Sequence, residues 1–403
     1  MLFYNFKIIC LAVAVAYYSS ASAQDFAALE ARLDRYVEEG ELPGGVILVR
    51  RGDETLLAHA FGFRDREADD AMQIDDQFRI ASQTKLIVSV GIMMLIEDGV
   101  LTLDTPLTAY FPEWQNVRVA TPSGTEELAR PIVLRDLLSH SSGIGYGFTE
   151  AWFGRGFNGW YFAESDRPIR EAVRAMADVP LAHQPGSGWT YGYNTDILGA
   201  LIAEVTGKPL GVFLDERLFE PLGMEKTQFF LDADEADNLA VVYSRQGDAL
   251  LRAPDPGGMV GQGHYVQGPK VVESGGAGLI STAEDYVRVL DMLRAGGAFG
   301  GQQLLSSETA ALMTEPVITS PAPDWYPGGT EFQFGLGHEV SKGRPNGRAA
   351  GSLGWGGAYH SVYWIDPDYD LSVVYLTQVI PSGDLDDETV IEQMIYNVLR
   401  SEN

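Results

Sequence analysis

The spacing of apolar residues along the chain predicts helices and strands in a mixed order. Apolar positions recur at helical spacing over residues 25–40, which predicts a first helix. The segments 44–52 and 55–63 are rich in strand-forming residues, and the short polar turn between them is typical of an antiparallel hairpin. A long apolar segment then begins after Ser82 and ends at Gly99. Ser82 is therefore expected at or near the start of a buried helix.

The remainder of the chain divides into a middle part and a C-terminal part. Over residues 112–268 the apolar spacing is helical or irregular, and strand-like alternation is sparse. Helices are predicted over about 282–293 and 386–400. Strands are predicted near 332–340, 360–366 and 371–379.

Strands at both ends of the sequence with helices between them predict an α/β (α+β sandwich) fold. We expect one antiparallel sheet built from both chain ends and flanked by helices. The α/β domain is predicted to comprise residues 24–111 and 269–403. A mostly helical inserted domain is predicted over residues 112–268.

The first 23 residues have the character of a secretory signal peptide. Lys7 precedes a short apolar stretch at 8–16, and Ala21, Ser22 and Ala23 form an A-x-A cleavage pattern. The apolar stretch is too short to span a bilayer as a helix, so a stable membrane anchor is not expected. The protein is thus predicted to be exported, to a periplasm or to the exterior.

The composition excludes several classes of function. The chain has one cysteine, Cys10, which lies inside the predicted signal peptide, so cysteine catalysis and disulfides are not expected. The formal net charge of −28 argues against nucleic acid as a partner. The six histidines show no metal-ligand spacing, and neither a metal nor a cofactor is expected. The sequence makes no prediction of the oligomeric state.

Ser82 and Lys85 are the first candidates for chemistry. A serine hydroxyl needs a base within hydrogen-bond reach to become a nucleophile, and the i, i+3 spacing places both side chains on one helix face. The apolar neighbours of Lys85 favour a neutral amine, which could act as that base. Taken alone, the S-x-x-K pattern is weak evidence, and a helix-capping serine followed by a solvated lysine explains it better. No G-x-S-x-G pentapeptide offers another serine nucleophile.

The pattern does not stand alone. FRIASQTK at 78–85 is followed by VLRDLLSHSSGIGYGF, then by PGSGWTYGYNTDILGALIAEVTG, and finally by GSLGWGGAYHSVYWIDP. Together these motifs resemble the serine β-lactamase and penicillin-binding-protein superfamily of the class C type, and most of all the family VIII carboxylesterases. The resemblance covers nearly the whole chain after the predicted signal peptide, in the family's order and rough spacing.

This resemblance implies a catalytic set. Ser82 would be the nucleophile, with Lys85 and the second-motif Tyr191 as a coupled pair that moves protons. The backbone N–H groups of Ser82 and Ala358 would form the oxyanion hole. The third motif would be Trp355, Gly356 and Gly357, on a strand that faces the nucleophile.

Two departures from the β-lactamase pattern bear on the substrate. Tyr193 stands where many β-lactamases carry an asparagine, and Trp355 stands where they carry a lysine that meets the lactam carboxylate. Both losses favour a neutral ester over an anionic lactam. Besides the third motif, Tyr193 and His140 are candidates for substrate contact, and His140 is also expected to order a loop near the active site. Core packing accounts for most of the aromatic stretch at 148–162, and some of its residues could form walls of an acyl or alcohol pocket.

The sequence therefore predicts a serine hydrolase that works through an acyl-enzyme. We expect a carboxylesterase for small-molecule esters with short to medium acyl groups, compatible with weak β-lactamase side activity. The first alternative is a β-lactamase or a D-alanyl-D-alanine carboxypeptidase. The second alternative is a non-catalytic binding protein on the same fold, against which the intact Ser82, Lys85 and Tyr191 argue.

Overall fold

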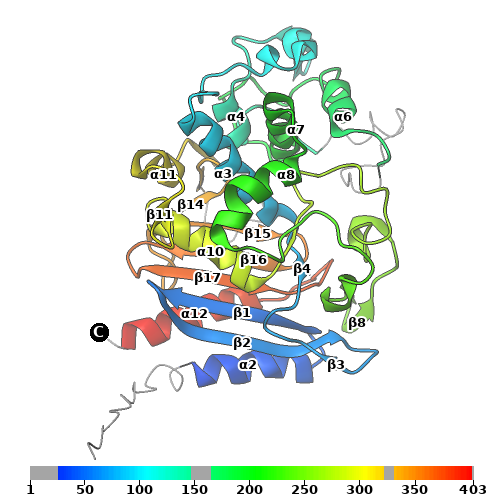
Figure 1. Cartoon of the computed structure of the whole chain (residues 1–403), viewed down its shortest axis with the longest axis vertical. Coiled ribbons are helices and arrows are strands. Elements are labelled where there is room, and N and C mark those ends of the chain that lie inside the picture. The colour runs from blue at the N-terminus through cyan, green and yellow to red at the C-terminus, as the bar shows by residue number, and fades with distance from the viewer. Residues whose placement is uncertain (1–25, 147–164, 322–330, 402–403) are drawn as a thin grey trace, which may run out of the picture.

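The computed structural model describes residues 26–146, 165–321 and 331–401 (Figure 1). The predicted signal peptide and the aromatic stretch at 148–162 lie outside these residues, so both stay predictions. Within the described ranges, no single helix is long and apolar enough to cross a membrane. The segments 194–206 and 210–222 would meet that test only together, and they are bent by 79° against each other.

One large antiparallel sheet joins the two ends of the chain, as predicted. In the described part of the chain it has nine strands in the order β12-β13-β14-β15-β16-β17-β1-β2-β3, and β1 pairs with β17 so that Val46 lies opposite Leu376. The strands are β1 (Gly44–Arg51), β2 (Glu54–Asp65), β3 (Asp70–Ala71), β12 (Ile318–Pro321), β13 (Glu331–Phe334), β14 (Glu339–Lys342), β15 (Ala350–Gly357), β16 (Ser361–Asp366) and β17 (Leu371–Leu376).

Each face of the sheet is covered by helices, because its central strands are apolar on both sides. Along β1, Val46 and Leu48 enter one hydrophobic core while Ile47 and Val49 enter another. Figure 1 shows α2 and α12 on one side of the sheet and α10 on the other. These helices are α2 (Ala27–Glu38), α12 (Asp387–Ser401) and α10 (Ala283–Arg294).

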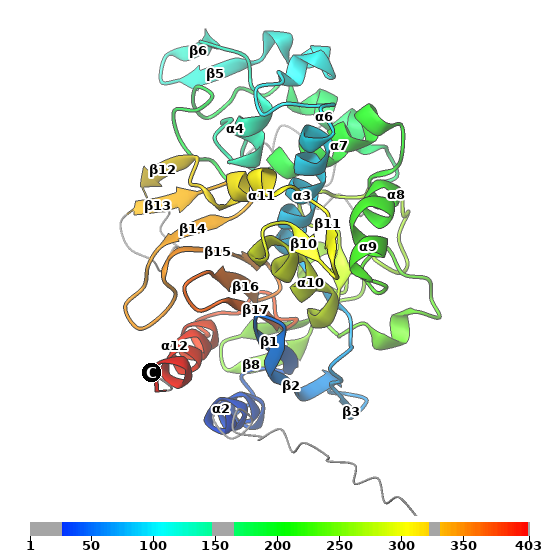
Figure 2. The same ribbon diagram turned by 60° about the vertical axis from the view of Figure 1, so that its left-hand side comes forward.

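Helix α3 (Thr84–Glu97) connects the sheet to the helical part of the molecule. Its residues from Thr84 to Leu95 are all buried, because α3 is apolar all round and is enclosed on every side. In Figure 2, α3 rises from the region of β16 to lie beside α7. The other helices of this part are α4 (Leu134–Leu138), α6 (Ile169–Met176), α7 (Asn194–Thr206), α8 (Leu210–Leu214) and α9 (Glu220–Leu222).

In its described residues, the middle part also contains two hairpins that the apolar pattern did not predict. They are β5 (Arg118–Thr121) with β6 (Gly124–Glu127), and β7 (Tyr243–Gln246) with β8 (Ala249–Arg252). Strand β6 is exposed throughout, so it lacks the alternation that marks a half-buried strand. One hydrophobic core extends from the sheet through α3 into this part, and the domain bounds given above stay a prediction.

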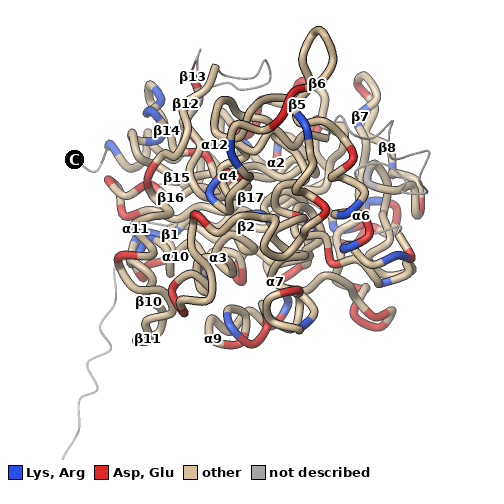
Figure 3. Tube along the Cα trace, turned by 90° about the horizontal axis from the view of Figure 1, so that it is seen from above, with Lys and Arg blue, Asp and Glu red and all other residues tan. Residues whose placement is uncertain are grey.

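The remaining elements are short. They are β4 (Phe78–Arg79), β9 (Ile280–Ser281), β10 (Ala298–Phe299), β11 (Gln302–Gln303), α11 (Ser307–Thr314), the 3-10 turns η1 (Ala81–Gln83), η2 (Leu107–Ala109), η3 (Pro112–Asn116), η6 (Ala236–Asn238) and η7 (Gly258–Val260), and a π-helical turn η5 (Asp215–Phe219). Figure 3 shows acidic residues spread around the trace rather than gathered in one patch.

A buried histidine ties the β15–β16 turn to α12. His360 Nε2 lies 2.6 Å from Asp387, whose other oxygen accepts from the Tyr375 hydroxyl at 2.6 Å. Burial by itself would lower the pKa of His360, but the carboxylates of Asp387 and Glu388 outweigh it and raise the pKa to about 9. The imidazolium therefore stabilises the folded protein.

The pH dependence of stability should report this ion pair. Because the folded pKa exceeds the unfolded value of 6.5, the stabilisation is complete below pH 6.5 and is lost as the pH rises through about 9. In the wild-type protein, the free energy of unfolding should fall by up to about 3 kcal/mol over that window. In His360→Gln this fall should be absent. Urea unfolding at both ends of the window measures the loss. His338→Gln is the control, because burial lowers the pKa of His338 to about 4, outside the window. An equal loss in wild type and His360→Gln would contradict the assignment.

Candidate active site

Ser82 lies in the tight turn η1 that leads into α3, as predicted. Ala81, immediately before it, has a φ of 42°, a left-handed conformation that is uncommon for a residue with a side chain. Hydrogen bonds hold the turn in place: Gln83 Nε2 donates to Ser361 Oγ at 3.1 Å, and the Tyr286 hydroxyl donates to the Gln83 carbonyl at 2.9 Å. The turn is thus fixed to both β16 and α10.

Lys85 lies directly beside the nucleophile, and its amine is surrounded by oxygen atoms. Nζ is 3.2 Å from Ser82 Oγ, 3.2 Å from the Tyr146 hydroxyl and 2.6 Å from the Gly276 carbonyl oxygen, and the residue is fully buried. An ammonium can donate to all three oxygens. A neutral amine can donate to two and accept from the Ser82 hydroxyl. The proton can therefore pass from Ser82 to Lys85 with the heavy atoms in place.

The Gly276 carbonyl is oriented by a buried carboxylate. Asp196, in the first turn of α7, accepts from Gly276 N at 3.1 Å and from Ser274 Oγ at 2.6 Å. A Cβ at position 276 would lie 2.3 Å from Asp196 Oδ2, so this approach requires glycine. Burial raises the pKa of Asp196, while Lys85 and these two donors act in the opposite direction.

Tyr146 is the residue of the site that the sequence analysis missed. Its ring meets that of Tyr191 edge to face at 5.5 Å between centroids. Burial, and next the proximity of Tyr191, raise the pKa of Tyr146 well above its usual value, so it stays a neutral phenol. Its only sequence signal was its place in the quoted motif at 133–148, two glycines and an isoleucine after Ser142.

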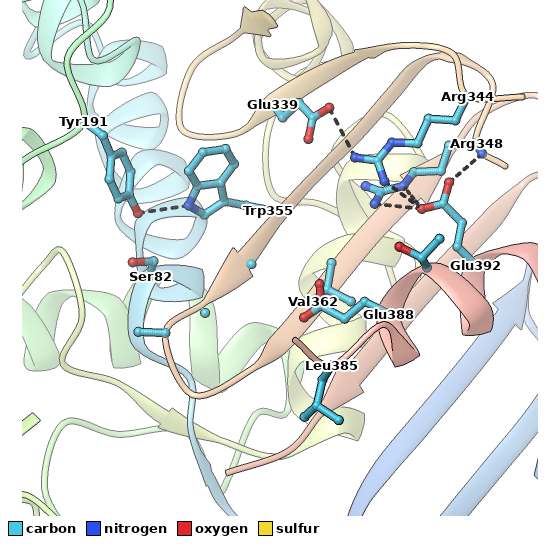
Figure 4. Close-up of a pocket in the computed structure, with 14 residues that line it drawn as sticks. Ser82, Tyr191, Glu339, Arg344, Arg348, Trp355, Val362, Leu385, Glu388 and Glu392 are labelled. Carbon is cyan, nitrogen blue, oxygen red and sulfur yellow. Dashed lines mark hydrogen bonds and ion pairs between the residues drawn. The ribbon is translucent and has the colours of Figure 1, made fainter. Parts of the chain in front are cut away.

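Tyr191 lies where the resemblance predicts, next to the lysine. Lys85 Nζ is 4.7 Å from the centre of the Tyr191 ring, and the Tyr191 hydroxyl accepts from Trp355 Nε1 at 3.0 Å (Figure 4). Ser82, Tyr191 and Trp355 line the same pocket, of about 540 Å³. The three motifs thus converge at one site.

The strand that carries the third motif comes unusually close to the nucleophile turn. A Cβ at Gly357 would lie 2.6 Å from the Ile80 carbonyl oxygen, so only glycine allows β15 to approach so closely. Gly356, Gly357 and Ala358 line the pocket together with Ser82. This placement suits an oxyanion hole made by the N–H groups of Ser82 and Ala358, which stays a prediction.

Two candidates for substrate contact, His140 and Tyr193, do not line this pocket, and their contact with substrate stays a prediction. His140 and Tyr193 are fully buried. His140 packs behind Tyr191 at 4.8 Å between ring centres, and its Nδ1 lies 2.8 Å from Asn194 Nδ2. Burial, and next the charge of Lys85, lower the pKa of His140 well below its usual value. The neutral imidazole therefore supports Tyr191 from behind.

A sequence model of the family described as Beta-lactamase matches residues 29–393. The chain belongs to the beta-lactamase family. Esterase EstB from Burkholderia gladioli is 32% identical over 90% of this chain and 94% of its own. Lovastatin esterase from Penicillium rubens is 32% identical over 78% of this chain and 82% of its own.

One of the solved structures similar to this chain is that of a hydrolase. EstCE1, described as a hydrolase with promiscuous acyltransferase activity, superposes with a TM-score of 0.81 and 28% identity, covering 94% of this chain and 99% of its own. The antiparallel sheet with its helical layers is thus the fold of this family.

Within the described ranges, no group of three or more His, Cys, Asp or Glu side chains could hold a metal ion.

Removing the Tyr146 hydroxyl should slow catalysis without unfolding the protein. Tyr146→Phe deprives the buried Lys85 amine of one of its three oxygen partners, and hydrogen bonds to charged groups justify an expected loss of about tenfold or more in kcat. Steady-state kinetics on p-nitrophenyl butyrate measure the loss. Tyr110→Phe, a partly buried tyrosine outside the site, is the control. An unchanged kcat in Tyr146→Phe across the pH range would show that Lys85 does not depend on this contact.

Proposed function

We propose that the protein is a carboxylesterase that hydrolyses small-molecule esters through an acyl-enzyme on Ser82. The observation that carries the proposal is the oxygen-lined position of the Lys85 amine, 3.2 Å from Ser82 Oγ and able to take its proton. Two relatives over most of the chain are named as esterases, which supports the same conclusion.

The reaction divides into acylation and deacylation. Ser82 Oγ attacks the ester carbonyl as its proton passes to Lys85, with Tyr191 as the group that relays a proton to the leaving alkoxide. The N–H groups of Ser82 and Ala358 stabilise the tetrahedral oxyanion. Water then attacks the acyl-enzyme and the same pair accepts its proton. As the bond between the acyl carbon and Ser82 Oγ breaks, the pair returns that proton to Oγ and the acid leaves.

The polar groups around the site favour an ester over a β-lactam. The amide of Asn194 is fully buried and bonds within the protein, donating to the Ile144 carbonyl at 3.0 Å and accepting from Ser142 Oγ at 2.5 Å. It therefore offers no contact to an acylamino side chain. Trp355 replaces the cation that would meet a lactam carboxylate. We assign a weak β-lactamase activity at most.

We also propose that the protein works outside the cytoplasm. The basis is the sequence of the first 23 residues, with its short apolar stretch and A-x-A pattern.

Relative rates on two substrates test the proposed function. We expect the mature protein to hydrolyse p-nitrophenyl butyrate at least about a hundredfold faster than a chromogenic cephalosporin, because the lactam-binding amide and cation are missing. Ser82→Ala should abolish both activities, and the rates are followed by absorbance. A faster cephalosporin reaction would make the protein a β-lactamase. Absence of both reactions in folded protein would favour a binding role.

A further inference from the structure

We propose that the pocket beside Ser82 recognises a positively charged group, so that the preferred esters carry an ammonium. This inference rests on the proposed acyl-enzyme chemistry at Ser82 and specifies its substrate class. Glu388 is the residue assigned to meet the cation.

The charged side chains that line the pocket include more carboxylates than guanidinium groups. Three carboxylates face two guanidinium groups, and all five belong to the segments β14 to β15 and α12 (Figure 4). They are Glu339, Glu388, Glu392, Arg344 and Arg348. The buried cation Lys85 is not part of the lining. By formal charge, the lining therefore has one more carboxylate than guanidinium group.

Both arginines are already paired with carboxylates of the protein. Arg348 Nη2 and Nε each lie 3.0 Å from Glu392 Oε2, and Arg344 Nη1 lies 3.1 Å from the same oxygen. Arg344 also lies 3.9 Å from Glu339. An anionic substrate would have to displace these contacts, so the guanidinium groups are poor candidates for binding one.

Glu388 differs from the other two pocket carboxylates in that its ion-pair partner is a histidine and not an arginine. His360 Nδ1 is 3.8 Å away, and the other nitrogen of that ring is bound to Asp387 at 2.6 Å. Burial raises the pKa of Glu388, while His360, Arg348 and Arg344 act in the opposite direction. The Glu388 side chain is 39% exposed, and Figure 4 shows its carboxylate directed toward Val362, on the side of α12 that faces the nucleophile. Glu388 is thus accessible from the pocket that Ser82 also lines.

The rest of the lining suits an alkylated ammonium. Val362 and Leu385 provide apolar contacts next to Glu388, and Tyr191 and Trp355 place two aromatic rings in the same pocket, 5.3 Å apart. Aromatic rings attract organic cations, and their attraction adds to that of a carboxylate. A trimethylammonium or a primary ammonium on a short alkyl chain would meet both kinds of group.

Two pairs of isosteric esters test this inference. In one pair the ammonium is on the alcohol, and in the other it is on the acyl group. Butyrylcholine is compared with 3,3-dimethylbutyl butyrate, and p-nitrophenyl 4-(trimethylammonio)butanoate with p-nitrophenyl 5,5-dimethylhexanoate. In at least one pair we expect kcat/KM to favour the cationic ester by about fivefold or more, as a partly screened ion pair allows. Glu388→Gln should remove most of this ratio, and 0.5 M NaCl should reduce it.

Two variants make the result specific. Glu308→Gln, an exposed carboxylate on α11, changes the net charge equally and should keep the ratio. Calorimetric binding of both pairs to Ser82→Ala tests recognition without turnover, and the cationic ester should bind more tightly. Hydrolysis of the neutral esters with no cationic preference in either pair, or with one that Glu388→Gln leaves intact, would overturn this inference and leave the esterase proposal standing. Failure to hydrolyse any ester would count against the esterase proposal instead. In that case binding to Ser82→Ala still tests the inference, and equal binding within both pairs would overturn it.

Discussion

A lysine amine with no exposed surface must find oxygen partners inside the protein, and this requirement organises the site. Burying a charge without partners costs several kcal/mol, so the acceptors around Lys85 have to be held in place by the fold. They come from three separate segments: the turn before α3, the loop that contains Tyr146, and the loop that contains Gly276. The position of Lys85 thus links the sheet-bound nucleophile to the helical part of the molecule.

Glycines allow backbone segments to lie close to the catalytic residues. Gly357 lets the end of β15 lie against the Ile80 carbonyl, and Gly276 lets its loop lie against Asp196. Gly192 lies between Tyr191 and Tyr193, where a Cβ would come within 2.4 Å of the Ile144 carbonyl oxygen. Substituting any of these would move a catalytic group rather than only weaken a contact.

The sequence predicted the parts of the structure that depend on local pattern. The β1–β2 hairpin and helices α2, α3, α10 and α12 follow apolar spacing, and the joining of both chain ends in one sheet was confirmed by the β1–β17 pairing. Strand β15 has a glycine-rich sequence without alternation, so only the family resemblance indicated it. The Gly276 carbonyl is a backbone atom with no sequence signal at all.

Tertiary packing determines which side chains reach the site, and the sequence pattern does not predict this. His140 and Tyr193 are polar residues in active-site motifs, and the sequence does not say that both would face inward. Tyr146 became part of the site because a loop distant in sequence carries it to Lys85. Glu388 lines the same pocket as Ser82 because α12 shares a hydrophobic core with β16.

The account depends on a covalent intermediate at one serine. Its most direct test is peptide mass spectrometry of protein quenched during turnover of p-nitrophenyl butyrate. We expect a butyryl group on the peptide that contains Ser82, with the modification on that side chain and absent from Ser82→Ala. A butyryl group on another residue, or turnover with no acylated peptide under conditions that slow deacylation, would contradict the account.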